Sequence, residues 1–209
     1  MTYDKKIAEL FIQNFNEAYR SAKLLMSSYN RVANLMPLKG NVLTSLNEDD
    51  LDKLDAFRVR YCDLQDSLGN KTFRSILMLE EEIPGSNLDM LNKMEKRGII
   101  KTFEAWKLLR YVRNLFSYDY PETDDQKAET LNIAYSNTLS LLKVADNVIK
   151  YMEDKLNFPM KNFGKNLRKN PFLIACAEGL SNRILFSSAK MSNILINHPP
   201  WLETRIYFS

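Results

Sequence analysis

Apolar residues recur at spacings of three and four over residues 4–36. At about 100° of rotation per helical residue, this spacing gathers them on one face of a long amphipathic helix. The positions that form this apolar stripe are Ile7, Leu10, Phe11, Phe15, Ala18, Ala22, Leu25 and Met26. Lys39 and Gly40 mark the predicted end of the helix.

A second long amphipathic helix is predicted to begin at Asn47. The Asn47 side chain can cap an acidic first turn, Glu48 to Asp50, whose negative charge suits the positive end of a helix dipole. Gly69 is predicted to bend this helix, and Pro84 to end it. Its apolar stripe consists of Leu51, Leu54, Phe57, Tyr61, Leu64, Leu68, Phe73, Ile76, Leu77 and Leu79.

Capping residues then predict two further helices. One covers residues 87–97 and stops at Gly98, because glycine readily adopts the left-handed conformation that follows a helix. The next begins after Thr102, which can cap it with support from Glu104. Its predicted buried side consists of Phe103, Trp106, Leu109, Val112 and Phe116.

Pro121 disfavours helical geometry at Tyr120, so this fourth helix is predicted to loosen over residues 117–120. A last helix is predicted over residues 123–154, with apolar residues at helical spacing along its length. Five helices joined by short connections predict an all-α helical bundle.

Composition supports one helical domain followed by an appendage. The chain has 209 residues, 45% of them hydrophobic and 26% charged, which suits a single sizeable core. We expect residues 1–155 to form the helical domain. Residues 156–209 are expected to form a linker and C-terminal extension, because prolines, a glycine and the basic run 165–169 interrupt the helical pattern there.

The net charge of +3 is unevenly distributed along the chain. Residues 160–209 hold seven Lys and Arg against two acids, which leaves 22 basic against 24 acidic residues in 1–159. The helical domain therefore lacks a broadly basic nucleic-acid-binding surface. Any contact with RNA has to come from a local cluster of basic residues.

Cysteine spacing and the N-terminus point to a reduced, cytoplasmic, soluble protein. Cys62 and Cys176 lie far apart and match no metal-binding or redox motif. The first residues lack the apolar run of a signal peptide, and no stretch approaches the roughly 20 apolar residues that span a bilayer. The acidic run Glu80 to Glu82 has no histidines beside it, so we expect a solvated helix end there and no metal site.

A local basic cluster lies at the end of the fourth predicted helix. Trp106, Arg113 and Tyr120 are seven residues apart and lie almost on one line of the helix, with Arg110 beside them. Guanidinium groups bind phosphate through paired hydrogen bonds, so Arg110 and Arg113, with Asn114, could hold an RNA backbone. In the alternative interpretation, both arginines are surface residues that pair with the acidic run 80–82.

The segment 73–121 resembles the HepT-like branch of the HEPN ribonuclease toxins. The signature of that family is arginine, four residues, histidine, one residue and tyrosine. Here Arg113 occupies the arginine position and Tyr120 the tyrosine position, but Tyr118 stands where the family has histidine. The resemblance covers nearly all of residues 1–155. Its matching positions include Ile76, Leu91, Gly98, Ile99, Ile100, Trp106, Leu109, Arg113, Asn114, Asp119 and Tyr120.

The resemblance implies RNA cleavage by a homodimer that needs neither metal nor cofactor. It assigns catalysis to Arg113, Asn114 and Tyr118, and phosphate binding to Arg110 and Arg113. The family's histidine moves a proton near neutral pH, whereas a phenol with a pKa of about 10 does not. We therefore expect impaired cleavage. The one histidine of the chain, His198, lies far downstream between Asn197 and Pro199 and is expected to be solvated.

The same resemblance implies a protein partner. The family's toxins are commonly encoded beside a nucleotidyltransferase antitoxin that transfers AMP to the signature tyrosine, which makes Tyr120 the expected acceptor. Residues 194–209 are similar to the segment that precedes the Gly-Ser motif of such transferases. That motif and its metal-binding aspartates are absent from the sequence, so no transferase activity is expected.

Two alternatives remain open from the sequence. The chain could be a non-catalytic HEPN binding module that serves as partner or nucleotide-binding subunit of a nucleotidyltransferase. It could also be a structural helical protein whose match to the signature is accidental. RNA cleavage by the natural protein, Tyr118→His and Arg113→Ala distinguishes the first alternative. The second predicts that Arg113 and Tyr120 of two chains do not face one cleft in a dimer.

Overall fold

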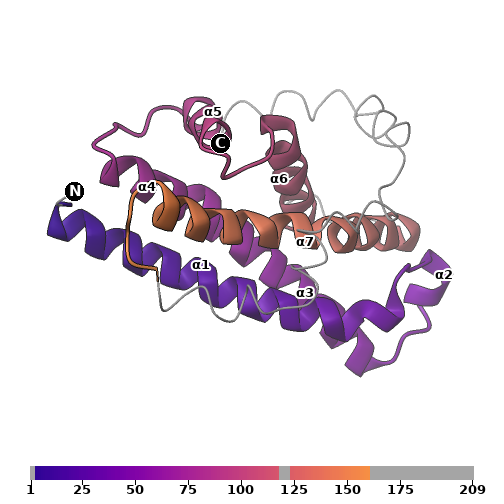
Figure 1. Cartoon of the computed structure of the whole chain (residues 1–209). Helices are drawn as coiled ribbons and strands as arrows, with labels where there is room; N and C mark the ends of the chain where they lie inside the picture. Colours follow the sequence, from indigo (N-terminus) through magenta and orange to yellow (C-terminus); the bar gives the residue numbers. More distant parts are fainter. Residues whose placement is uncertain (1–2, 118–122, 161–209) are drawn as a thin grey trace. The chain divides into compact units, whose positions relative to one another are not determined.

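A computed structural model describes residues 3–117 and 123–160, which are helical and contain no strand (Figure 1). These residues all lie in the first of the chain's two units, Met1–Ile174. The predicted all-α bundle is confirmed for this part of the chain. Its helices are α1 (Lys5–Val32), α2 (Gly40–Leu43), α3 (Glu48–Asp66), α4 (Phe73–Leu79), α5 (Asn87–Lys96), α6 (Phe103–Ser117) and α7 (Asp124–Asp154).

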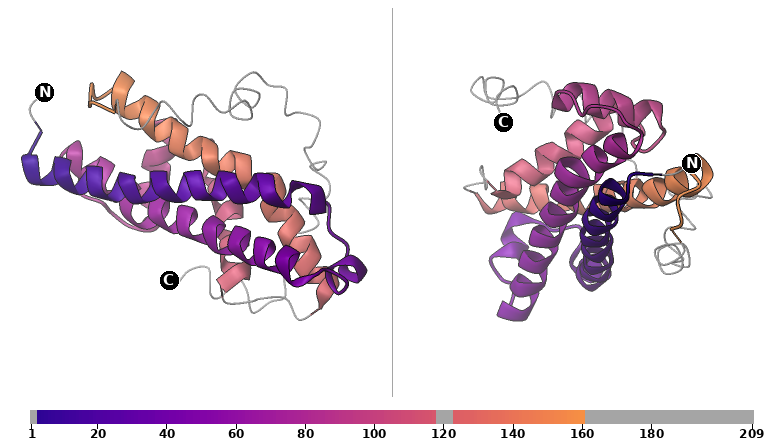
Figure 2. Two further views of the ribbon diagram at one scale, coloured as in Figure 1. Left: turned by 90° about the horizontal axis from the view of Figure 1, so that it is seen from below. Right: turned by 90° about the vertical axis from the view of Figure 1, so that its left-hand side faces the viewer.

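Helices α1 and α3 run side by side, and α7 packs against both (Figures 1 and 2). The α1 stripe predicted from the sequence supplies part of this core: Phe11, Phe15 and Leu25 are fully buried. Helix α6 contacts α3 and α7, so its C-terminal end lies over α3. Burial of these apolar faces against one another is the main stabilising contribution to the bundle.

The end of the first helix differs from the prediction. Helix α1 stops at Val32 and passes into a short 3-10 turn, whereas Gly40 opens the single-turn helix α2. A Cβ atom on Gly40 would lie 2.0 Å from Asp125 Oδ1, so the α2 backbone approaches α7 too closely for any side chain. Asn132 of α7 holds the same region, because its amide exchanges two 2.8 Å hydrogen bonds with the Leu38 backbone. This contact between distant segments holds the chain that follows α1 against α7.

Helix α3 continues into α4 through a π-helical segment, Ser67–Thr72. The segment replaces the bend that the sequence predicted at Gly69. The α6 indole approaches Gly69 here: a Cβ on Gly69 would lie 3.0 Å from Trp106 Cζ2. A π turn widens the helix by one residue, which lets the backbone accommodate a close neighbour without breaking.

The predicted caps at Asn47 and Thr102 are confirmed, and a third helix has a cap that was not predicted. Asn47 Oδ1 accepts from the Asp50 N–H at 2.9 Å, and Thr102 Oγ1 accepts from the Ala105 N–H at 3.1 Å. Thr123 forms a capping box with Gln126 at the start of α7. These side chains satisfy N–H groups that have no partner within the helix.

Shortly after the ends of α4, α5 and α7, one residue has a positive φ. Glu81, Gly98 and Asn157 have φ values of 59°, 66° and 49°. After each, the chain turns back to bond the preceding helix: the Ile99 N–H donates to the Met94 carbonyl at 3.0 Å, for example. The predicted role of Gly98 as the residue that ends α5 is confirmed.

Replacing Gly98 with alanine is expected to lower the free energy of unfolding by about 1 kcal/mol. A Cβ atom at Gly98 would meet no heavy atom within 4 Å, so the loss comes from the left-handed backbone alone. Urea unfolding followed by circular dichroism measures it. Glu81→Gly is the matched control, because it places a glycine at another residue with positive φ, and it should raise the free energy of unfolding. An unchanged free energy of unfolding in Gly98→Ala would contradict the expected strain.

Several predicted features lie outside the described residues. They are Cys176, His198, Tyr118, Tyr120, Pro121, the basic run 165–169 and most of the C-terminal extension 156–209.

Candidate functional site

The last turn of α6 rests on a row of polar side chains from α3. Arg58, Cys62 and Asp66 are four residues apart, so they lie along one line of α3; we call them the α3 polar row. Arg58 Nη1 donates to the Phe116 carbonyl at 3.0 Å. The Cys62 thiol lies 3.8 Å from the Arg113 carbonyl. The row therefore binds carbonyl groups at the C-terminal end of α6.

Asp66 binds the side chain of Arg113, the central candidate residue. Both Nε and Nη2 of Arg113 donate to Asp66 Oδ2, at 3.1 and 2.7 Å. The Arg113 side chain is 19% exposed and that of Asp66 is 35% exposed. The pair is thus partly shielded from water, but a molecule in solution can reach it.

Arg113 also contacts the neighbouring candidate residue. Its Nη1 donates to Asn114 Oδ1 at 3.3 Å. Arg110 is half-buried on the same helix, close to one turn earlier. The structure therefore brings Arg113 and Asn114 together at the end of α6. This helix is described up to Ser117, the residue before Tyr118.

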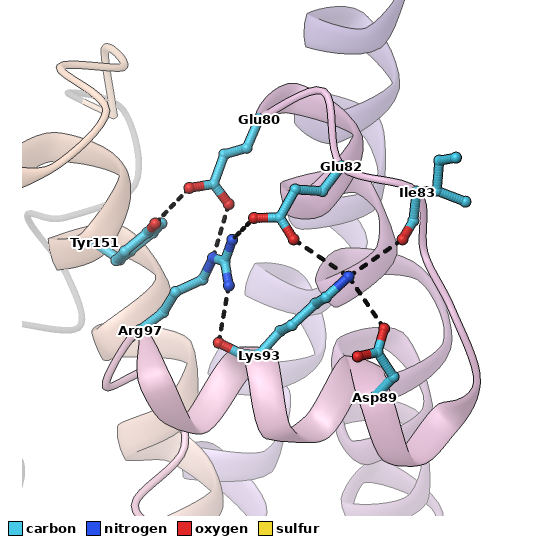
Figure 3. A network of polar contacts seen from close by, with 7 residues as sticks. All are labelled: Glu80, Glu82, Ile83, Asp89, Lys93, Arg97 and Tyr151. Carbon is cyan, nitrogen blue, oxygen red and sulfur yellow. Dashed lines mark hydrogen bonds and ion pairs between the residues drawn. The ribbon is translucent and has the colours of Figure 1, made fainter.

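The alternative partner expected for Arg113 is wrong. The acidic run at the end of α4 is engaged by α5, as Figure 3 shows: Arg97 binds Glu80 and Glu82, and Lys93 binds Glu82. Arg113 pairs with Asp66, which the sequence interpretation had not considered. Asp66 is the last residue of α3, whereas the acidic run 80–82 follows α4. The π-helical segment therefore lies between the observed partner of Arg113 and the expected one.

Further acidic groups lie near Asp66, the carboxylate that binds Arg113. Partial burial, together with the neighbouring carboxylates of Asp66 and Glu17, raises the pKa of Asp63. Glu17 forms an ion pair of 2.7 Å with Lys71. Positive and negative side chains therefore both contribute to the electrostatic potential near Arg113. Such a surface attracts a polyanion less strongly than a purely basic cleft does.

The thiol in the α3 polar row is not an activated nucleophile. Burial raises the pKa of Cys62 despite the lowering influence of a hydrogen bond to Ser117 and of the Arg113 charge. A raised pKa keeps the thiol protonated near neutral pH, and a thiol is nucleophilic as the thiolate. Cys62 therefore serves as a packing and hydrogen-bonding group at this helix end.

The residue beside Cys62 fixes the position of α6 from within the core. Tyr61 is fully buried, and its ring meets Phe116 edge to face at a centroid distance of 5.9 Å. Among the described residues, its hydroxyl has no hydrogen-bond partner. Burial raises the pKa of Tyr61, so the phenol remains neutral.

The sequence analysis missed the α3 polar row. The apolar stripe of α3 was recognised, and Phe57, Tyr61 and Leu64 are buried as expected. Arg58, Cys62 and Asp66 each lie one or two residues past a stripe position, at the edge of the buried face. Their spacing of four was the available signal, but the spacing does not say which helix they contact.

Within residues 3–117 and 123–160, no group of three or more His, Cys, Asp and Glu side chains could hold a metal ion. No helix in the same residues combines the length and apolar character needed to cross a bilayer. None of the protein-family models, curated proteins or solved structures compared with the chain matches it.

Proposed function

We propose that this chain is the HepT-like HEPN toxin component of a toxin–antitoxin pair. In this proposal it is a metal-independent endoribonuclease whose activity is reduced because Tyr118 replaces the signature histidine. The observation that carries the proposal is the arrangement at the end of α6. Asp66 and Asn114 hold the Arg113 guanidinium in place on the last turn before Tyr118.

Each candidate residue has a chemical role in the proposal. Arg113 binds the scissile phosphate and stabilises the charge that develops in the transition state. Asn114 orients Arg113, and Arg110 binds a neighbouring phosphate. Tyr118 replaces the proton-transferring histidine of the signature, and a phenol, whose ordinary pKa is about 10, is a poor base for the ribose hydroxyl at neutral pH. This accounts for a nuclease with low intrinsic activity.

The proposal also includes the protein's partners. Two copies form a homodimer in which both Arg113 residues face one cleft. A cognate nucleotidyltransferase serves as antitoxin and transfers AMP to Tyr120, which adds a bulky anion beside Arg113. Negative charge there repels the RNA backbone, so the modification inhibits cleavage. All of these components act in the cytoplasm.

Cleavage of single-stranded RNA in EDTA tests the proposal. Tyr118→His is expected to raise the cleavage rate by about 100-fold, because a positioned general base near neutral pKa contributes at least this much. Adding Arg113→Ala should abolish the gain. Arg74→Ala removes an exposed arginine from α4 and is the matched control, expected to have no effect.

Two results would contradict the proposed nuclease. One is that Tyr118→His, folded as judged by thermal unfolding, cleaves RNA no faster than the natural protein. The other is that cleavage by the natural protein survives Arg113→Ala, because then Arg113 would not belong to the site. Product mapping by gel electrophoresis separates genuine cleavage from a contaminating nuclease, since the pattern must change with Arg113.

A second candidate function is a non-catalytic HEPN module that binds a nucleotidyltransferase. The observation that favours it is the engagement of the Arg113 guanidinium by both Asp66 and Asn114. A phosphate has to compete with these contacts. This candidate expects no RNA cleavage even in Tyr118→His, and a stable complex with the transferase in size-exclusion chromatography.

A further inference from the structure

The two carboxylate oxygens of Asp66 have different partners. Oδ2 accepts both hydrogen bonds from Arg113, whereas Oδ1 lies 3.4 Å from Asn70 Nδ2 on the exposed side of the π segment. Asp66 is the last residue of α3, and its side chain is 35% exposed. The carboxylate can therefore leave Arg113 and remain solvated beside Asn70.

A carboxylate and a phosphodiester bind a guanidinium group in the same way. Each offers two oxygens to a pair of parallel N–H groups, and each is held by charge-assisted hydrogen bonds. Asp66 occupies the Nε and Nη2 groups of Arg113. Ion pairs exposed to this degree are weak enough to exchange with ligands in solution.

We propose that the Asp66 carboxylate is an internal competitor for the Arg113 guanidinium, which a phosphodiester of RNA must displace in order to bind. The inference rests on the proposed function, because it takes RNA as the ligand of Arg113. It adds a regulatory element to that site. In the absence of RNA the arginine is held in place, and binding requires the ligand to supply a better anion than Asp66.

Asp63 distinguishes this competition from a general effect of negative charge. It lies on α3 three residues before Asp66 and is exposed, and the two carboxylates are close enough for Asp66 to raise the pKa of Asp63. No hydrogen bond or ion pair joins Asp63 to Arg113 among the described contacts. Neutralising either residue removes one negative charge from the same surface, but neutralising Asp66 alone removes the competitor.

The test measures binding of a fluorescein-labelled single-stranded RNA of about 12 nucleotides by fluorescence anisotropy, in EDTA at constant salt. Asp66→Asn is expected to tighten binding about fivefold, the upper end for one partly exposed ion pair. Asp63→Asn should change it by less than about twofold, since a charge without direct contact is screened. Asp66→Glu retains a carboxylate and should bind like the natural protein.

A second variant keeps the test valid if Asp66→Asn does not fold. Asn70→Ala changes an exposed residue and removes a hydrogen bond that holds the Asp66 carboxylate while it binds Arg113. It is expected to tighten RNA binding about twofold, because the competing carboxylate is held less firmly. Weaker binding by this variant would contradict the competition.

The failure of this inference can be told apart from failure of the proposed function. If the natural protein and Asp66→Asn bind RNA no better than their Arg113→Ala derivatives, Arg113 is not an RNA site and the proposed function falls. If binding depends on Arg113 but Asp66→Asn binds no more tightly than Asp63→Asn, only the competition is overturned. Weaker binding by Asp66→Asn overturns it as well, because Asp66 then assists Arg113.

Discussion

Replacing Trp106 with alanine is expected to lower the free energy of unfolding by about 4 kcal/mol, within the range for a large aromatic removed from a core. Trp106 is 2% exposed, and its ring lies 4.8 Å from that of Phe73 at an angle of 52°. The indole also fills the space over Gly69 in the π segment. Removing the indole would leave a cavity between α6 and the continuous helix formed by α3, the π segment and α4. Urea unfolding measures the resulting loss of stability.

Two variants in α6 serve as controls for Trp106→Ala. Trp106→Phe keeps an aromatic ring and should lose less than half as much stability, because the remaining cavity is smaller. Phe103→Ala removes an aromatic ring from the half-buried start of α6 and should also cost clearly less. Equal losses for Trp106→Ala and Phe103→Ala would show that the contact with the π segment contributes nothing particular.

Replacing Arg97 with alanine is expected to cost about 2 kcal/mol, because it leaves the partly buried carboxylate of Glu80, and that of the more exposed Glu82, without their partner. Arg97 is 13% exposed and binds Glu80 and Glu82 at the end of α4, and Glu80 in turn accepts a hydrogen bond from Tyr151 of α7 (Figure 3). The network joins three helices. Lys93→Ala removes a more exposed partner of Glu82 and should cost clearly less stability than Arg97→Ala.

The cost of Arg97→Ala is expected to shrink in acid. Partial burial alone would raise the pKa of Glu82, but hydrogen bonds from Arg97 and Lys93 outweigh it and lower that pKa. A carboxyl group with a lowered pKa stabilises the fold above its unfolded-state value, near 4.3, and this stabilisation is lost as pH falls through the folded-state value. Urea unfolding of the natural protein and of Arg97→Ala at pH 7 and at pH 3 measures this change. A larger difference in unfolding free energy between the two proteins at pH 3 than at pH 7 would contradict the expectation.

The helices themselves were predictable because their signals are local. The apolar spacing that buries Phe11 and Phe15, the cap at Asn47 and the stop at Gly98 each depend on residues within a few positions. Hydrogen bonds within a helix join residues four apart, so a short stretch of sequence contains the information that forms them. The same reasoning recognised Arg113 and Asn114 as neighbours on one helix.

The end of α1, the π segment and the partner of Arg113 were decided only by the tertiary structure. Gly40 lies against Asp125, Gly69 against Trp106, and Arg113 bonds Asp66, 47 positions earlier in the chain. From the sequence, the acidic run 80–82 was the only partner considered for Arg113, whereas the structure pairs it with Asp66. Helical periodicity places residues on a face, but the choice of opposing face depends on how helices pack, which is a property of the assembled core.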